Sequence, residues 1–423
     1  MGAGAHGSSR DAAAVYGMAT ASALEGIRPA GLGGPVSTAS PRMLSLSFMA
    51  IMGGIGAFGP FLGLVLDRLG HSAAVIGGLL ALVPITRIAS APLWSMIADR
   101  YRVGARILQA ATLTTTLVAV AVASGRLGAV GLGFTLVVFA FARAPIGPIL
   151  DGLTVRALEA RRGDAAGYGP IRLWGSVAFL VMAGAAALVA DAVALPTAPM
   201  VLAAGAWAVG ALVLLGLPAG EGGPPVSLGP ALRGLAARPG IGLVVAALPL
   251  HGMGLNAYDS WFALHVEQLG LASIWTGVAL AVGVVMEVAV MAVGGRILAR
   301  FRPESLVSLS MVVAAVRWCV TALISDPWLL TAVQALHGVA FAVFWVGVIE
   351  LFRRASAPEI RASAQAVVMT ACYGLGPLLT SVVGGVLVDD HGTGALFGAA
   401  GLAAAVGAVL TGVGGRRLAA ASG

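Results

Sequence analysis

The sequence has little charge, no lysine and almost no cysteine. Only 10% of its 423 residues are charged and 59% are hydrophobic, whereas a soluble domain has about 25% charged residues. We therefore expect this chain to lie in a lipid bilayer. All 25 Lys+Arg residues are arginines, which we attribute to codon composition. Without lysine there is no phosphate-binding loop ending in GKS, so ATP hydrolysis within this chain is excluded.

The two cysteines, Cys319 and Cys372, both lie within apolar runs. This excludes a disulfide framework and a cysteine-based metal cluster, and we expect no cofactor, no metal and no nucleic-acid partner. Residues 1–42 are rich in glycine, alanine and serine and contain no apolar core of signal-peptide length. We expect them to form a mobile cytoplasmic tail, so the first hydrophobic segment acts as its own signal.

Apolar runs of about 20 residues, long enough to cross a bilayer, occur at twelve places, six on each side of a polar segment at 218–240. The expected fold is an all-α integral membrane protein with twelve transmembrane helices in two six-helix bundles. The expected domains are the tail, a bundle over 43–217, a cytoplasmic linker over 218–240, a bundle over 241–415 and a C-terminal tail over 416–423. The predicted spans lie near 44–66, 73–97, 106–123, 128–155, 170–190, 195–217, 241–265, 272–297, 304–323, 328–352, 362–388 and 393–413.

The arginines between the spans alternate along the chain. Only Arg68 and Arg126 lie in odd-numbered connections. Because cytoplasmic loops carry an excess of arginine, both termini are predicted to be cytoplasmic in a cell membrane, as an even number of spans requires. The arginines of the even-numbered connections are Arg100, Arg102, Arg106, Arg156, Arg161, Arg162, Arg233, Arg238, Arg296, Arg300, Arg302, Arg353, Arg354 and Arg361.

The two halves of the sequence resemble each other at a shift of 200 residues. Residues 54–102 align without a gap on 254–302 with twelve identities, about twice the number expected for this composition. Repeats that are six spans apart have the same orientation, an arrangement typical of secondary transporters with a binding site between the halves. The shift also places Arg87 opposite Glu287, so equivalent positions carry opposite charges.

Several ionisable residues lie deep in predicted spans. At 1.5 Å per residue, Glu287, Arg317 and His337 each lie about 20 to 24 Å from the nearest cytoplasmic loop, on three consecutive spans. Intramembrane charges usually mark ion or substrate pathways, so we predict a proton-exchanging network around a cavity. The alternatives are a structural Glu287–Arg317 ion pair and a core histidine. Asp259, nearer the outer surface, belongs either to this network or to an outer vestibule.

In the first half, Arg87 and Arg143 lie at the membrane midplane without an obvious acidic neighbour. Guanidinium groups bind carboxylates in a fork, so these arginines suit an anionic substrate. Asp151 and Arg172 lie lower, at similar heights, where they would form a pair unless Arg172 only marks the cytoplasmic side.

The segment YGPIRLWGSVAF at 168–179 resembles the span 5 motif of the phenylpropionate permease and lactose permease branch of the major facilitator superfamily. The resemblance extends over 43–415. It implies proton-coupling roles for Glu287, Arg317, His337 and Asp259 and substrate contacts for Arg172 and Phe179. Two departures argue against sugar transport by the lactose permease scheme: Gln334 lies near the place of a span 10 lysine, and Ala340 replaces an acid.

The loop SMIADRYRVGAR at 95–106 resembles the superfamily loop between spans 2 and 3, and GRILARFR at 295–302 resembles its counterpart in the second half. The resemblance implies that these loop residues form a gate coupling the halves. The predicted gating residues are Asp99, Arg100, Asp151, Gly295 and Arg300.

Together these observations predict a monomeric, proton-coupled symporter, not an enzyme, that imports a small organic or aromatic carboxylate by alternating access. Glu287 would be protonated, and Arg87 and Arg143 would hold the anion. Candidate apolar and aromatic contacts are Trp174, Tyr258 and Trp345. The alternatives are a proton-driven exporter, a sugar or nucleoside symporter, and a membrane-embedded enzyme or sensor without transport.

Overall fold

The computed structural model describes residues 39–101, 103–162, 167–217, 238–357 and 360–420, and every regular element in these ranges is helical. The first half comprises α2 (Pro41–Arg68), α3 (Ala73–Tyr101), α4 (Gly104–Ala123), α5 (Ala129–Arg143), α6 (Ile146–Arg162), α7 (Tyr168–Ala192) and α8 (Ala198–Leu214). The second half comprises α10 (Ile241–Gln268), α11 (Ile274–Ala292), α12 (Gly294–Arg300), α13 (Pro303–Leu323), α14 (Pro327–Val333), η1 (Gln334–Leu336), η2 (Gly338–Val343), α15 (Phe344–Ala355), α16 (Arg361–Thr370), η4 (Ala371–Leu375) and α17 (Gly376–Ala420).

Each of the twelve predicted spans coincides with a helix or with consecutive helices of the described chain, which confirms the all-α membrane fold. The predicted span 128–155 is interrupted between α5 and α6, where Pro145 follows Ala144. The predicted spans 362–388 and 393–413 run together into α17, which bends at Gly392. Gly392 has a φ of 77°, a left-handed conformation that glycine adopts without strain.

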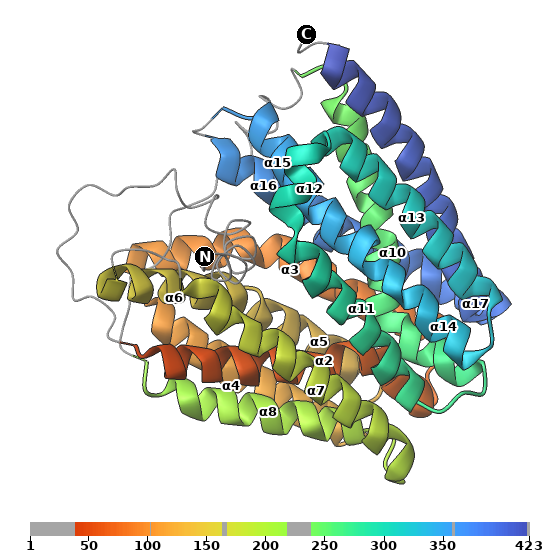
Figure 1. Ribbon diagram of the computed structural model, residues 1–423. Helices are drawn as coiled ribbons and strands as arrows, with labels where there is room; N and C mark the ends of the chain where they lie inside the picture. The colour runs from red at the N-terminus through yellow and green to blue at the C-terminus, as the bar shows by residue number, and fades with distance from the viewer. Residues whose placement is uncertain (1–38, 102, 163–166, 218–237, 358–359, 421–423) are drawn as a thin grey trace, which may run out of the picture.

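The helices form two groups, α2–α8 and α10–α17 (Figure 1). The ribbons of the groups meet near the ends of α2 and α11 and diverge toward α6 and α15. The predicted linker falls mostly within 218–237 and the N-terminal tail within 1–38, both outside the described residues. The predicted domain boundaries therefore stay predictions, although α17 continues to Ala420, past the start of the expected C-terminal tail.

The turns after α2 and α10 are built alike. Both helices have 28 residues, and Gly70 and Gly270 follow them with φ values of 86° and 73°. The backbone hydrogen bonds also repeat at a shift of 200, since Gly70 N donates to Asp67 O and Gly270 N to Glu267 O, each at 2.8 Å. These equivalent turns support the internal repeat that the sequence indicates.

Two helix crossings without bulky side chains join the groups. In one, α3 crosses α17 where a Cβ on Gly77 would collide with the backbone of Gly385. In the other, α11 crosses α7 where a Cβ on Gly277 would lie 3.2 Å from the Cα of Gly184. Small residues let helix backbones approach closely. The two crossings are equivalent in the repeat, so the halves face each other with approximate twofold symmetry.

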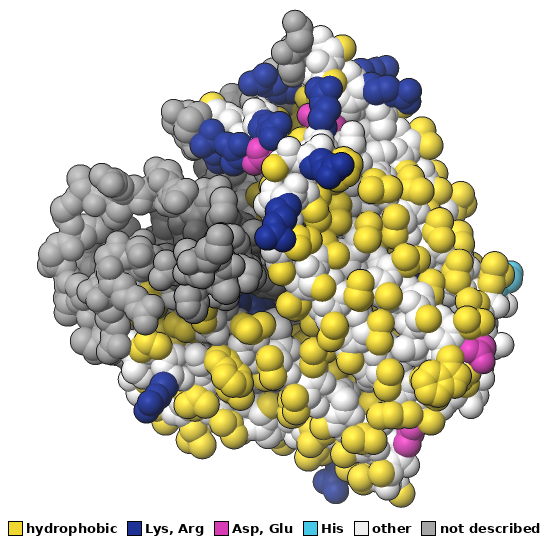
Figure 2. Space-filling model, in the orientation of Figure 1, with side chains coloured by type: hydrophobic (Ala, Val, Ile, Leu, Met, Phe, Trp, Pro, Cys, Tyr) yellow, Lys and Arg dark blue, Asp and Glu magenta, His cyan; other side chains and the backbone are white. Residues whose placement is uncertain are grey.

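The outside of the helix groups is apolar. Figure 2 shows hydrophobic side chains over much of the visible face, while arginines gather at one end of the second half. Leu323 is 86% exposed and Trp328 is 71% exposed, which would be unfavourable in water and suits contact with lipid. The chain is therefore a multi-pass membrane protein.

Candidate functional site

Arg317 on α13 is the centre of a buried polar cluster. Its side chain has no exposed surface, and it donates to Gln334 Oε1 through Nε at 3.0 Å and Nη2 at 2.7 Å. Its Nη1 lies 2.9 Å from Nδ1 of His337, which accepts this hydrogen bond because a guanidinium can only donate. The guanidinium carbon also lies 4.3 Å from the ring centre of Tyr258 and 3.9 Å from that of Trp318. Hydrogen bonds and aromatic faces thus compensate for burying this charge.

His337 extends this cluster to Glu287 on α11. The His337 Nε2 atom lies 3.5 Å from Glu287 Oε2. The helix around His337 is irregular, with a 3-10 segment before it and a π segment after it, and π segments often occur at functional sites. Gly338 has no side chain to hold the segment away from α11, since a Cβ there would lie 2.6 Å from the carbonyl oxygen of Met286. We call Glu287, Arg317, Gln334 and His337 the Arg317 cluster.

The cluster joins three of the predicted proton-coupling residues, but in an order that the sequence does not indicate. Glu287 contacts His337, which in turn contacts Arg317, so His337 lies between the two. Only 13% of the Glu287 side chain is exposed. The alternative of a direct Glu287–Arg317 ion pair stays a prediction. His337 is partnered, but by side chains rather than by a backbone carbonyl.

A cavity of about 190 Å³ lies between the two halves. Helices α2, α3, α5 and α8 supply one wall, and α10, η4 and α17 supply the other. Its polar and charged lining residues are Arg87, Arg143, Asn256, Asp259, Ser260 and Tyr373. The structure thus brings the two predicted anion-binding arginines to one wall of the same cavity.

Asp259 lies in this cavity and not within the Arg317 cluster. Its side chain is exposed to the cavity, and it forms no ion pair with any residue in the described part of the chain. The preceding residue, Tyr258, points the other way along α10 and packs against Arg317. One turn of α10 therefore contacts both the cavity and the Arg317 cluster.

The other predicted substrate contacts lie outside the cavity lining. Trp174 is 50% exposed, and Phe179 lies where α7 packs on Gly56 of α2. Trp345 stacks on Tyr373, with ring centres 5.5 Å apart, so it supports a lining residue from behind. Arg172 lies over the ring of Phe48, with its guanidinium carbon 5.4 Å from the ring centre.

Asp151 has a close hydrogen-bond partner other than Arg172, and the pair with Arg172 stays a prediction. Its carboxylate accepts a hydrogen bond of 2.7 Å from the hydroxyl of Tyr168, which begins α7. Of the other predicted gating residues, the side chains of Asp99 and Arg100 lie outside the described residues. Gly295 and Arg300 are exposed on α12.

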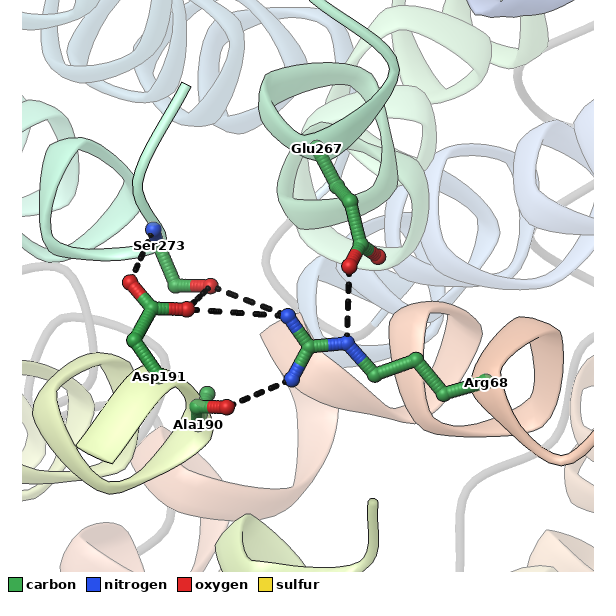
Figure 3. Close-up of polar contacts among 5 residues, drawn as sticks. All are labelled: Arg68, Ala190, Asp191, Glu267 and Ser273. Carbon is green, nitrogen blue, oxygen red and sulfur yellow. Dashed lines mark hydrogen bonds and ion pairs between the residues drawn. The ribbon is translucent and has the colours of Figure 1, made fainter. Parts of the chain in front are cut away.

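At the end where the halves meet, Arg68 joins three helix ends (Figure 3). Its Nε donates to Glu267 Oε1 at 2.8 Å and its Nη1 to the carbonyl of Ala190 at 2.6 Å. Its Nη2 lies 3.6 Å from Asp191 Oδ1 and donates to Ser273 Oγ at 3.4 Å. Asp191 also accepts from the backbone N–H and the hydroxyl of Ser273, each at 2.6 Å. We call these five residues the Arg68 cluster.

An equivalent contact lies across the approximate twofold axis. Asp389 on α17 accepts hydrogen bonds from the backbone N–H groups of Ala73 at 2.7 Å and Ala74 at 2.9 Å. These N–H groups begin α3, and carboxylates are favourable at helix N-termini. Asp191 acts in the same way on Ser273, which precedes α11. Each half thus caps a helix of the other half with an aspartate.

The sequence did not predict the two aspartate caps, Asp191 and Asp389, or three of the six polar residues that line the cavity. Asn256, Ser260 and Tyr373 are uncharged and look like ordinary helix residues in the sequence. The sequence did mark Arg68 as unusual, because it is one of only two arginines in odd-numbered connections. An arginine that departs from the charge rule has a local reason to be there, in this case two acidic partners.

Comparisons with known proteins agree with this arrangement. The model of the MFS_1 like family matches residues 42–399. Maltose permease of Geobacillus stearothermophilus is 28% identical over 365 residues, covering 85% of this chain and 91% of the permease. A probable 3-phenylpropionic acid transporter of Escherichia coli (strain K12) is 27% identical over 372 residues, covering 85% of this chain and 94% of that protein.

Solved structures have the same fold at lower identity. The nucleoside transporter NupG superposes with a TM-score of 0.75 at 18% identity, covering 89% of this chain and 98% of that chain. A bacterial homologue of the human lysosomal transporter Spinster, in an inward-facing and unoccupied conformation, superposes with a TM-score of 0.63 at 12% identity, covering 89% and 96%. The predicted fold class and the prediction that the chain is not an enzyme are confirmed, and the chain belongs to the MFS_1 like family of major facilitator superfamily transporters.

Proposed function

We propose that this transporter is a proton-coupled symporter that imports a small organic carboxylate by alternating access. The observation that carries the proposal is the cavity between the halves, which has two arginines on one wall. Neither Arg87 nor Arg143 has an ion-pair partner within the described residues. Arg87 is exposed and Arg143 partly exposed where they line the cavity, and a carboxylate ligand would form charge-assisted hydrogen bonds with them.

The Arg317 cluster supports proton coupling. Glu287 is the carboxylate of the cluster, and the imidazole of His337 connects it to the permanently charged Arg317. Such a group changes its proton affinity when its surroundings change. If the halves rock, the surroundings of Glu287 change, which links proton binding to the orientation of the cavity.

Alternating access requires contacts at one end of the molecule that can break. The Arg68 cluster and the Asp389 cap join the halves at the end opposite the arginine-rich loops. We place the arginine-rich end and both termini in the cytoplasm of a cell with an inner or plasma membrane, following the positive-inside rule. The Arg68 cluster then closes the outer side, and a monomer contains the whole pathway.

Transport in proteoliposomes tests the coupling. A symporter that moves one proton with each monoanion accumulates substrate about tenfold per pH unit of imposed gradient. We expect Glu287→Gln to abolish this accumulation while keeping exchange of labelled for unlabelled substrate. Asp326→Asn is the matched control: Asp326 caps α14, asparagine caps equally well, and this acid lies outside the cluster. A Glu287→Gln variant that still accumulates substrate would refute the coupling role.

A sugar or nucleoside substrate is the second candidate, since relatives are described as a maltose permease and a nucleoside transporter. Asn256, Asp259 and Ser260 could accept hydroxyl groups of such a ligand. A binding screen over aromatic acids, short-chain acids, sugars and nucleosides separates the candidates. The direction of flux under an imposed gradient distinguishes import from a proton-driven exporter.

A further inference from the structure

The charged groups of the cavity differ in sign between the two halves. The first half supplies two guanidinium groups, Arg87 from α3 and Arg143 from α5. The second half supplies acceptors from consecutive turns of α10. Asp259 has no ion-pair partner among the described residues, and the side-chain oxygen of Asn256 is buried without any hydrogen bond, although its nitrogen donates to Ser260 Oγ at 3.1 Å. The two walls thus offer donors on one side and unsatisfied acceptors on the other.

The wall from the first half is also aromatic. Phe58 stacks on Phe139 with ring centres 4.7 Å apart and an angle of 27°, and Trp207 lies 5.3 Å from Phe58. All three line the cavity beside the arginines. A ligand held by the arginines therefore lies next to aromatic rings, which favours an aromatic ring over a hydrated chain. The volume of about 190 Å³ suits a small ligand.

The net charge of the lining residues further restricts the class of ligand that fits the cavity. With Asp259 ionised, two arginines and one aspartate give the cavity a surplus of one positive charge, which one carboxylate neutralises. A second carboxylate would face Asp259 and be repelled. An ammonium group would pair with Asp259, but a ligand with both an ammonium and a carboxylate is neutral and leaves the surplus in place. A hydroxyl group carries no charge and donates one hydrogen bond, which is what an unpaired carboxylate or amide oxygen lacks.

We propose that the cavity binds a hydroxylated aromatic monocarboxylate. Arg87 and Arg143 hold its carboxylate, the ring packs on Phe58, Phe139 and Trp207, and the hydroxyl donates to Asp259 or Asn256. This assignment rests on the proposed function, because it takes the arginines to be the anion site. It adds the second polar end of the ligand and makes Asp259 the residue that selects the substrate.

Four probes that differ only at the para position test this assignment on the purified full-length protein. They are 4-hydroxybenzoate, benzoate, benzene-1,4-dicarboxylate and 4-(aminomethyl)benzoate, with affinities measured by calorimetry. A hydrogen bond to a charged group is worth enough to change affinity about tenfold or more. We therefore expect 4-hydroxybenzoate to bind at least about tenfold more tightly than benzoate and benzene-1,4-dicarboxylate, and more tightly than 4-(aminomethyl)benzoate, which leaves the cavity with a net positive charge.

Substitutions in the cavity test which residues cause the difference in affinity between 4-hydroxybenzoate and benzoate. Asp259→Asn should lower the ratio of the 4-hydroxybenzoate affinity to the benzoate affinity toward one, while Arg143→Gln should weaken both ligands. Asp326→Asn, outside the cavity, should change neither.

Equal affinity for benzoate and 4-hydroxybenzoate would overturn this inference and leave the carboxylate function standing. An equal loss of both ligands in Asp259→Asn would overturn the role of Asp259. Tighter binding of the dicarboxylate or of the aminomethyl acid would overturn the charge count. Failure of all four acids to bind would overturn both this inference and the proposed carboxylate substrate.

Discussion

Replacing Arg68 by glutamine should open the end of the transporter that the Arg68 cluster closes. Glutamine keeps a hydrogen-bonding side chain but removes the charge that joins Glu267 on α10 to Asp191 on α7. The negative groups then lose their common partner. The equilibrium between outer-closed and outer-open forms should shift toward the open form, because the contacts of Arg68 with Glu267 and Ser273 exist only when the ends are together.

The contacts of Arg68 set the size of the shift. The ion pair with Glu267 is 2.8 Å long but partly exposed, with side-chain exposures of 21% and 35%, so we assign it about 0.5 kcal/mol. The hydrogen bond to Ser273 Oγ is long, at 3.4 Å, so we assign it about 0.5 kcal/mol. The contacts with Ala190 and Asp191 lie within the first half and persist when the halves separate. A total of about 1 kcal/mol corresponds to a roughly fivefold shift of the equilibrium.

Cysteine labelling measures this shift. Ser260 lines the cavity, so Ser260→Cys in a protein without Cys319 and Cys372 is a reporter for access from outside. An impermeant maleimide added to right-side-out vesicles should label it up to about fivefold faster after Arg68→Gln. Arg126→Gln, the other arginine of an odd-numbered connection, should leave the rate unchanged. Labelling rates within about twofold for both variants would refute the closing role of Arg68.

Three further outcomes follow from the structure. Arg317→Met should lower the free energy of unfolding by about 3 kcal/mol, because it leaves buried acceptors on Gln334 and His337 without donors, and chemical denaturation in detergent checks this. Gly77→Val should stop uptake because its side chain collides with α17, whereas Gly78→Val, with open space around it, should transport normally; equal uptake would contradict the crossing. Gly70→Ala and the same change at position 270 should each cost about 1 kcal/mol in thermal unfolding, and a large difference would contradict the equivalence of the two turns.

The spans and the repeat were predictable because a bilayer imposes a strict requirement on the chain. Each crossing needs about 20 apolar residues, and two copies of one ancestral bundle keep similar turns, as Gly70 and Gly270 do. The breaks within spans were less predictable. The 3-10 and π segments around His337 depend on packing against α11, to which Gly338 contributes, and no local pattern in the sequence encodes them.

For the candidate site, the sequence indicated the charged residues but not their partners. Depth along a helix placed Glu287, Arg317 and His337 at one level, and they do lie together. Depth says nothing about which way a side chain points, so it left open whether Asp259 belongs with them, and Asp259 lines the cavity instead. Trp174 illustrates the same limit, because it is 50% exposed and is not among the residues that line the cavity.

The two halves use equivalent positions for different chemistry. Arg87 and Glu287 are related by the repeat, yet Arg87 lines the cavity and Glu287 contacts His337 behind it. The half with the unpaired guanidinium groups is suited to the anion, and the half with the Arg317 cluster is suited to the proton. Coupling between them then has to cross α10, where Asp259 faces the cavity and the adjacent Tyr258 packs on Arg317. A ligand that pulls on Asp259 therefore moves the helix turn that supports Arg317, which gives the proposed substrate and proton sites a direct mechanical connection.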